Sequence, residues 1–217
     1  MKILKAEQLC KTMEGRFTLG PVNLELDPGE ILGVIGPRGS GKTALLRLLW
    51  GFTRPDAGRI LLLGLEPHLH HLEVRLKTGY VPENPNFWES FTVKEHLRFV
   101  GSFYRGWNEH RCDQLTEEFG LDPGASLGKL TPGERAKVNV ISALGHHPSL
   151  IILDEPASGA DTVGQHQILR FLRHLANKED TAVVITSGIS DDLDHIRSEE
   201  HTSELQSRFG ISYAVFC

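Results

Sequence analysis

The residues that point most directly to chemistry form a glycine-rich loop close to the N-terminus. The loop matches the pattern G-x-x-x-x-G-K-S/T, in which glycines let successive backbone N–H groups turn inward toward phosphates. The lysine adds a point charge for the β- and γ-phosphates, and the hydroxyl after it can bind Mg²⁺. A plain glycine turn is the alternative, but an apolar strand before the loop and a helix after it favour phosphate binding. The candidate nucleotide ligands are Gly36, Pro37, Arg38, Gly39, Ser40, Gly41, Lys42 and Thr43.

A second set of candidate residues follows the apolar run Leu150–Leu153, where the chain reads Asp154-Glu155. Ligands of open α/β sheets bind at the carboxyl ends of the strands, which is where these two acids stand. Asp154 is therefore a candidate Mg²⁺ ligand, and Glu155 is a candidate catalytic residue that orients and polarises a water molecule. A solvated acidic turn after a strand is the alternative.

The elements that must position these residues alternate between strands and helices. Such alternation predicts an α/β fold with a mostly parallel sheet, preceded here by an N-terminal β part. A mainly helical run then predicts a helical subdomain inserted at about residues 86–145. We expect strands at 3–9, 22–27, 31–35, 59–63, 79–81, 150–153 and 181–186, and helices at 43–50, 92–104, 109–119, 133–144 and 162–176.

Composition narrows the class of protein. The chain has 217 residues, of which 40% are hydrophobic and 24% charged, so disorder and fibrous folds are excluded. A net charge of -5 argues against nucleic-acid binding by bulk electrostatics. No apolar run approaches the roughly 20 residues that span a bilayer, and the first residues do not read as a signal peptide. Three cysteines without a paired framework favour a reduced, cytosolic compartment.

Further motifs give the chain a family resemblance. Residues 154–161 read DEPASGAD, residues 130–135 read LTPGER, and residues 79–83 read GYVPE. With the glycine-rich loop, these segments resemble the ATP-binding subunit of ABC transporters, over nearly all of residues 3–196. The resemblance is closest to exporters of the drug- and bacitracin-resistance type. It implies a P-loop NTPase with a RecA-like, mostly parallel sheet and an N-terminal antiparallel β part, and ATP and Mg²⁺ as ligands.

The resemblance also implies roles for residues outside the first two motifs. Thr131, Gly133 and Glu134 stand where the family has the signature that faces the γ-phosphate bound by the other subunit. From the residues alone, Thr131 and Glu134 predict a helix N-terminal capping box, and a helix start without a ligand is the alternative. Glu83 stands at a metal-binding position. For adenine contacts, the resemblance implies Met13 or the nearby aromatic Phe17.

Two departures from the family pattern predict slow hydrolysis. Pro132 replaces a glycine of the signature and so removes one N–H donor. Gly188 stands where the family has a histidine that contacts the γ-phosphate, and loss of one such donor typically slows the reaction by about 10²–10³.

The C-terminal segment 197–217 has a different character. Its runs RSEEHTSELQS and ISYAVFC are similar to the in-frame translation of a common sequencing adapter, at matching spacing. We therefore expect a non-native tail after a cassette that spans 1–196 and is truncated at its C-terminus.

The resemblance thus implies an ATP-hydrolysing subunit that powers a separate transmembrane permease of an ABC exporter. It would work as a homodimer or with a paralogous ATPase, in the cytoplasm at the inner face of the membrane, without nucleic acid. Two alternatives stay open: a non-catalytic ATP-binding regulatory subunit, and a non-transport ABC protein that acts on ribosomes or DNA.

Overall fold

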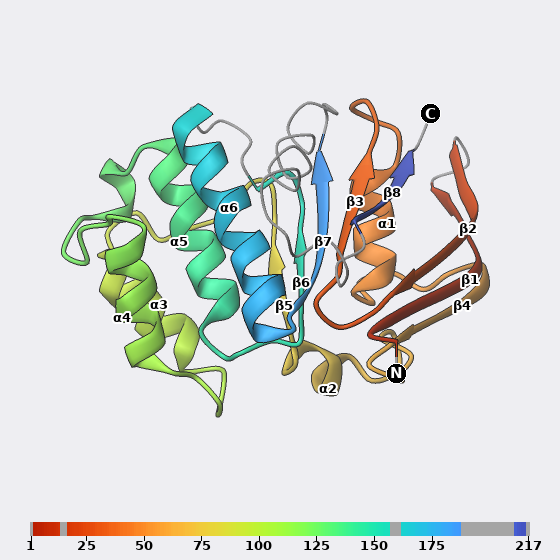
Figure 1. Ribbon diagram of the computed structural model, residues 1–217, viewed down its shortest axis with the longest axis horizontal. Coiled ribbons are helices and arrows are strands. Elements are labelled where there is room, and N and C mark those ends of the chain that lie inside the picture. Colours follow the sequence, from red (N-terminus) through yellow and green to blue (C-terminus); the bar gives the residue numbers. More distant parts are fainter. Residues whose placement is uncertain (1, 14–16, 157–161, 188–210, 216–217) are drawn as a thin grey trace, which may run out of the picture.

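The computed structural model describes the chain except for residues 1, 14–16, 157–161, 188–210 and 216–217. Its strands form two sheets, as predicted: a three-stranded antiparallel sheet of order β2-β1-β4 and a five-stranded parallel sheet of order β5-β6-β7-β3-β8 (Figure 1). The first comprises β1 (Leu4–Met13), β2 (Phe17–Leu26) and β4 (Ala57–Leu62), and the second β3 (Ile31–Ile35), β5 (Thr78–Val81), β6 (Leu150–Leu153), β7 (Ala182–Ser187) and β8 (Ile211–Val215).

Helices cover both faces of the parallel sheet. Helix α1 lies between the two sheets, whereas α3, α4, α5 and α6 gather on the opposite side, far from β1 and β2 (Figure 1). The region between 86 and 145 is helical, and no strand is described there. The helices are α1 (Lys42–Leu49), α2 (His71–Arg75), α3 (Val93–Gly101), α4 (Glu109–Glu118), α5 (Pro132–Leu144) and α6 (Thr162–Glu179), with a 3₁₀ turn at Leu127–Lys129.

The parallel sheet divides the hydrophobic core into two layers. Along β6, Leu150 and Ile152 pack with α1 and the antiparallel sheet, whereas Ile151 and Leu153 pack with the helices of the other side. Successive side chains of a strand point to opposite faces, so a continuous apolar run fits a sheet that is covered on both faces. This burial fixes the register of the strands, and with it the positions of the loops at their carboxyl ends.

Helix α3 ends earlier than the sequence predicts. It begins with the capping box of Thr92 and Glu95 but ends at Gly101, not near residue 104. The Trp107 ring packs directly against Gly101, and the Ser102 hydroxyl turns back to donate to the Phe99 carbonyl oxygen at 2.6 Å. Packing against the next connection therefore stops the helix, although its apolar spacing continues.

The C-terminal segment contributes a strand that we did not predict. Ile211–Val215 forms β8 and pairs in parallel with β3, whose other edge pairs with β7. Its sequence ISYAV is rich in β-branched and aromatic residues, and such a segment readily adds to an open sheet edge. The sequence analysis assigned no element to 211–215, and the adapter-like origin of the tail stays a prediction.

Candidate functional site

The glycine-rich loop connects β3 to α1, as the sequence predicts. Gly39 and Gly41 adopt φ angles of 84° and 97°, in the left-handed region that glycine tolerates best. Gly41 is also the N-cap of α1, and the first turn of this helix carries no acidic residue. The positive end of the helix dipole is therefore not neutralised at this point, which favours an anion such as a phosphate.

Lys42 is almost completely buried, with 5% of its side chain exposed. Its ammonium group donates to the carbonyl oxygens of Gly36 at 2.6 Å and Pro37 at 3.1 Å. It also lies 3.1 Å from the Oε1 atom of Glu155. The loop and the acidic strand end, more than a hundred residues apart in sequence, thus meet in one site.

Ser40 provides an independent test of whether the loop fits a phosphate. Its hydroxyl is buried and has no hydrogen-bond partner in the part of the chain that the structure describes. A buried polar atom without a partner costs about 1–3 kcal/mol, and a phosphate oxygen would remove that cost. A buried cation, an unpaired hydroxyl and an open helix N-terminus together fit a phosphate group.

The acidic pair at the end of β6 is held by one threonine. The Thr186 hydroxyl donates to Asp154 Oδ1 and accepts the backbone N–H of Glu155, both at 2.9 Å. Asp154 also donates its own backbone N–H to the Val81 carbonyl oxygen. Glu155 has a φ of 44°, unusual for a residue with a side chain. Sequence patterns did not identify Thr186, because its partners lie on a neighbouring strand.

Glu83 lies beside the glycine-rich loop. Its Oε1 atom is 3.4 Å from the guanidinium of Arg38, which is 83% exposed. Asn139 of α5 donates to the Pro82 carbonyl oxygen at 3.1 Å and so fixes the segment next to Glu83. The structure therefore joins the predicted metal position to the phosphate loop on one side and to α5 on the other.

The predicted capping box at the start of α5 is confirmed. Glu134 Oε2 accepts both the backbone N–H and the hydroxyl of Thr131 at 2.8 Å, and Thr131 Oγ1 accepts the Glu134 N–H at 3.3 Å. These bonds hold the pKa of Glu134 below its usual value, with the Thr131 backbone as the main cause. Pro132 has no N–H, and the N–H groups of Thr131 and Glu134 are used in the capping box. Among the described residues, the Gly133 N–H therefore remains as the donor of this first turn that the box does not use.

The start of α5 does not touch the buried lysine. A cleft of about 390 Å³ lies beside the start of α5, and its walls include Glu83, Pro132, Arg135 and Pro156. Thr131, Gly133 and Glu134 thus lie at the start of α5, next to this cleft.

The remaining predicted residues are dispersed. Met13 and Phe17 are paired opposite each other at the end of the β1–β2 hairpin where the chain passes from β1 to β2, on the antiparallel sheet. Thr43 lies in the first turn of α1, next to Lys42. Gly188 and segment 157–161 lie outside the described residues. In the ranges that are described, no group of three or more His, Cys, Asp or Glu is arranged to hold a metal. A Mg²⁺ ion would therefore need phosphate or water ligands in addition, which is its usual preference.

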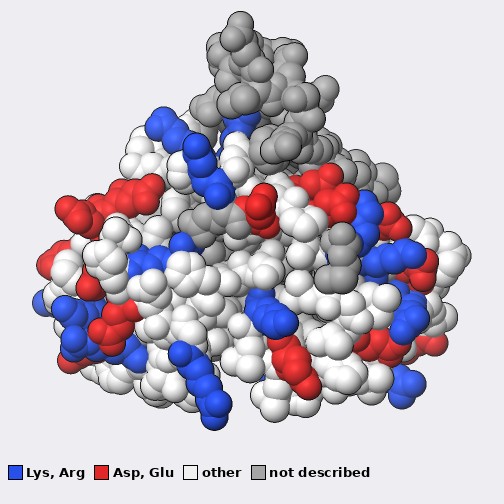
Figure 2. Space-filling view, turned by 60° about the horizontal axis from the view of Figure 1, so that its bottom comes forward, with Lys and Arg blue, Asp and Glu red and all other residues white. Residues whose placement is uncertain are grey.

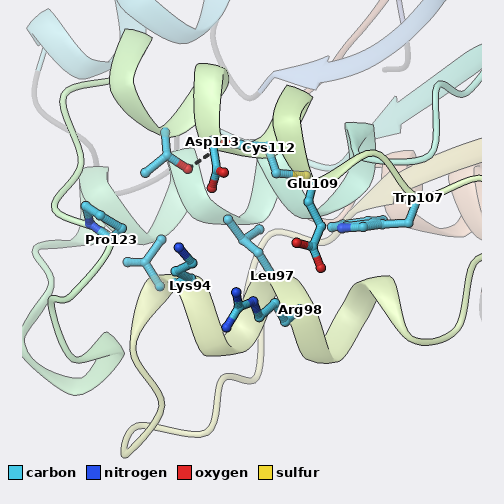
Figure 3. A pocket seen from close by; sticks show the side chains of 10 residues that line it. Lys94, Leu97, Arg98, Trp107, Glu109, Cys112, Asp113 and Pro123 are labelled. Carbon is cyan, nitrogen blue, oxygen red and sulfur yellow. Dashed lines mark hydrogen bonds between the residues drawn. The ribbon is translucent and has the colours of Figure 1, made fainter.

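A second hollow lies between α3 and α4, where Lys94, Arg98, Glu109 and Asp113 line its mouth (Figure 3). Its volume of about 20 Å³ suffices for a single water molecule. Burial raises the pKa of the adjacent Cys112 thiol to about 12, so this cysteine is not a nucleophile at neutral pH. The hollow is not a ligand site.

The charges on the molecular surface bear on the kind of partner that the chain could bind. Figure 2 shows basic and acidic side chains interspersed on one face, without a single-sign field there. Nucleic-acid binding depends on concentrated positive charge, so this face lacks the property that such binding requires.

Within the described ranges, no helix is long and apolar enough to cross a membrane.

Comparisons with known proteins show which family the chain resembles over most of its length. The family model described as ABC transporter matches residues 19–158. The lipopolysaccharide export system ATP-binding protein LptB of Haemophilus influenzae is 31% identical over 202 residues, which cover 89% of this chain and 84% of that protein. The bacitracin transport ATP-binding protein BcrA of Bacillus licheniformis is 28% identical over 196 residues, which cover 89% of this chain and 64% of that protein.

The fold agrees with solved structures. A structure described as the ATP-binding subunit of an ABC transporter superposes with a TM-score of 0.78 at 26% identity, covering 88% of this chain and 82% of that one. The chain spans 61 to 66% of the length of three curated relatives, BcrA among them.

Proposed function

The chain belongs to the ABC transporter family, whose ATP-binding subunits hydrolyse ATP, and we propose that it powers a separate membrane subunit of an exporter. The observation that carries the proposal is the meeting of Lys42 and Glu155 at 3.1 Å, beside the unpaired hydroxyl of Ser40. A phosphate-binding cation and a water-activating carboxylate are thereby within reach of one phosphate group.

The roles of the residues follow from their chemistry. The backbone N–H groups of the loop and the N-terminus of α1 bind the phosphates, and Lys42 exchanges its carbonyl partners for phosphate oxygens. Thr43, Asp154 and Glu83 would hold Mg²⁺ by their oxygen atoms, and the ion would supply neutralisation of charge on the phosphates. Glu155 leaves Lys42, orients a water molecule and accepts its developing proton. Met13 and Phe17 provide apolar surface for adenine.

We propose that two copies, or this chain and a paralogue, dimerise head to tail. Thr131, Gly133 and Glu134 of one chain then complete the ATP site of the other. The capping box supports a rigid helix start for this role. It also places the carboxylate of Glu134 there, which would repel a phosphate. A regulatory subunit with little hydrolysis of its own is the second candidate function, and this carboxylate together with Pro132 favours it.

The membrane partner has a candidate docking surface formed by α3 and the residues just before and after it. Trp88 is 54% exposed and Phe103 is 66% exposed, and both belong to a chain of aromatic rings that runs through Phe91 and Phe99. Exposed aromatic clusters of this kind are typical of protein interfaces. This surface follows directly after Glu83, so a partner bound there could sense the nucleotide site. Such docking would place the chain in the cytoplasm, at the inner face of the membrane.

The direction of transport is inferred from relatives. BcrA is named for bacitracin transport and LptB for lipopolysaccharide export, and we extend export to this chain.

The test is ATP hydrolysis in the presence of Mg²⁺. We expect the chain to hydrolyse ATP and the variant Glu155→Gln to lose hydrolysis while it still binds ATP, because only the water-activating carboxylate is removed. Glu118→Gln, which removes a carboxylate on α4, is the matched control and should hydrolyse ATP as the unchanged chain does. Equal hydrolysis by Glu155→Gln and the control would refute the assignment.

A further inference from the structure

Thr186 occupies a central place in the parallel sheet. It lies on β7, between β6, which ends in the two acids, and β3, which leads into the phosphate loop. It pairs with Val34 of β3, and its neighbour Ile185 pairs with Leu153 of β6. Thr186 is therefore level with the start of both functional segments.

The hydroxyl of Thr186 both donates and accepts a hydrogen bond. It has one proton, which goes to Asp154 Oδ1, and it accepts the backbone N–H of Glu155. Only 1% of the residue is exposed, so water cannot readily replace either bond. The first bond orients the Asp154 carboxylate by one oxygen, and the other oxygen, Oδ2, remains available to a further ligand.

The second bond acts on the backbone of Glu155. A residue with a side chain costs roughly 1–2 kcal/mol in the left-handed region, and Glu155 has a φ of 44° there. In this conformation its backbone N–H reaches Thr186 while its carboxylate lies 3.1 Å from Lys42. An extended conformation at Glu155 would redirect both groups.

We propose that Thr186 is a positioning residue for hydrolysis, whose single hydroxyl sets the metal-binding carboxylate of Asp154 and the backbone of Glu155 at once. The inference rests on the proposed function, because that proposal assigns metal binding to Asp154 and water activation to Glu155. Thr186 itself does not touch the nucleotide. Groups that orient metal ligands and catalytic carboxylates in this way typically contribute about 10–100-fold to activity or metal affinity.

The test compares three variants. Thr186→Val removes the hydroxyl at nearly constant shape, whereas Thr186→Ser keeps it. Thr181→Val is the matched control, because Thr181 is also buried and its hydroxyl donates to the Pro148 carbonyl oxygen at 3.2 Å, before the opposite end of β7. We expect kcat to fall by about 10–100-fold in Thr186→Val, with ATP affinity unchanged, and to return in Thr186→Ser. Thr181→Val should keep the kcat of the unchanged chain.

A second readout needs no nucleotide. Amide hydrogen exchange at Glu155, followed by NMR, should become faster in Thr186→Val, return to its protected rate in Thr186→Ser and stay unchanged in Thr181→Val. If Thr186→Val does not fold, Thr186→Ala removes the same hydroxyl with less side-chain volume.

The outcomes separate this inference from the proposed function. An unchanged kcat in Thr186→Val, a serine variant no better than valine, or equal losses of kcat and ATP affinity would each overturn the positioning role. A chain that binds no ATP would overturn the proposed function instead, and Glu155 amide exchange would then decide whether Thr186 holds the acidic pair.

Discussion

Trp107 is wedged between two glycines, and this contact joins the α3–α4 connection to the end of α5. A Cβ atom on Gly145 would lie 2.5 Å from Cζ3 and Cη2 of the ring, and one on Gly101 would lie 2.6 Å from Cδ1 and Nε1. The Gly145 carbonyl oxygen also accepts the backbone N–H of Asn108 at 2.8 Å. The Trp107 ring therefore leaves no room for a methyl group at Gly101 or Gly145.

Gly145→Ala should destabilise the chain. Overpacking of a filled site costs typically about 1–3 kcal/mol. Gly145 has the helical angles φ -61° and ψ -18°, so alanine fits the backbone and gains about 0.4–1 kcal/mol from the unfolded state. The steric term exceeds this gain, and we expect a net loss of about 1–2 kcal/mol, which lowers the unfolding midpoint by roughly 2–8 °C.

Thermal unfolding followed by circular dichroism measures the shift. Gly106→Ala is the matched control, because a Cβ atom there would meet no atom within 4 Å. In a Trp107→Leu background, Gly145→Ala should lose its cost, since the two changes act on one contact. The reasoning is refuted if Gly145→Ala unfolds with the wild-type midpoint, or if its cost is the same in the Trp107→Leu background.

The remaining predictions concern activity, pH and docking. Gly188→His should raise ATP turnover at least about tenfold with little change in ATP affinity; an unchanged turnover number contradicts the role given to position 188. Burial holds the pKa of His146 below its usual 6.5, so the unfolded chain takes up the proton first. The free energy of unfolding, measured with denaturant, should therefore fall as pH drops below about 6.5. The fall should be less steep in His146→Gln, in which buried His96, whose pKa is also lowered, still contributes. Equal slopes in both chains contradict this. A cysteine at Trp88 should cross-link to a co-expressed membrane partner, and a cysteine at exposed Glu25 of β2 should not; the reverse pattern refutes the docking surface.

Local sequence predicted the parts of the molecule that local chemistry determines. The phosphate loop, the capping box of Thr131 and Glu134, and the buried strand before Asp154 each depend on residues close together in the chain. The alternation of strands and helices also predicted the parallel sheet, because parallel strands require crossover connections that are usually helices. Helix α2 was not predicted, since five residues carry too little periodicity.

Contacts between distant segments could not be predicted in this way. The bonds of Thr186 to the acidic pair depend on β7 lying beside β6, and no pattern around Thr186 encodes its neighbours. The pairing of Arg38 with Glu83 and of Lys42 with Glu155 likewise depends on strand order. The strands predicted at 3–9 and 22–27 are shorter than the observed β1 and β2. The reason is that Gly20-Pro21 and the register shifts of β1 interrupt the alternation of apolar and polar residues.

The central claim is that the loop around Lys42 binds ATP with Mg²⁺, and calorimetric titration of ATP tests it most directly. Lys42→Ala removes a charged donor, which is worth about 1.5–3 kcal/mol, so the Kd should rise by roughly 10- to 150-fold. Lys137→Ala is the matched control, because the Lys137 ammonium also donates to a backbone carbonyl oxygen, that of Phe119 at 3.2 Å, but lies on α5. We expect a large loss of ATP affinity in Lys42→Ala and none in Lys137→Ala. Equal ATP affinity in Lys42→Ala and the unchanged chain would contradict it.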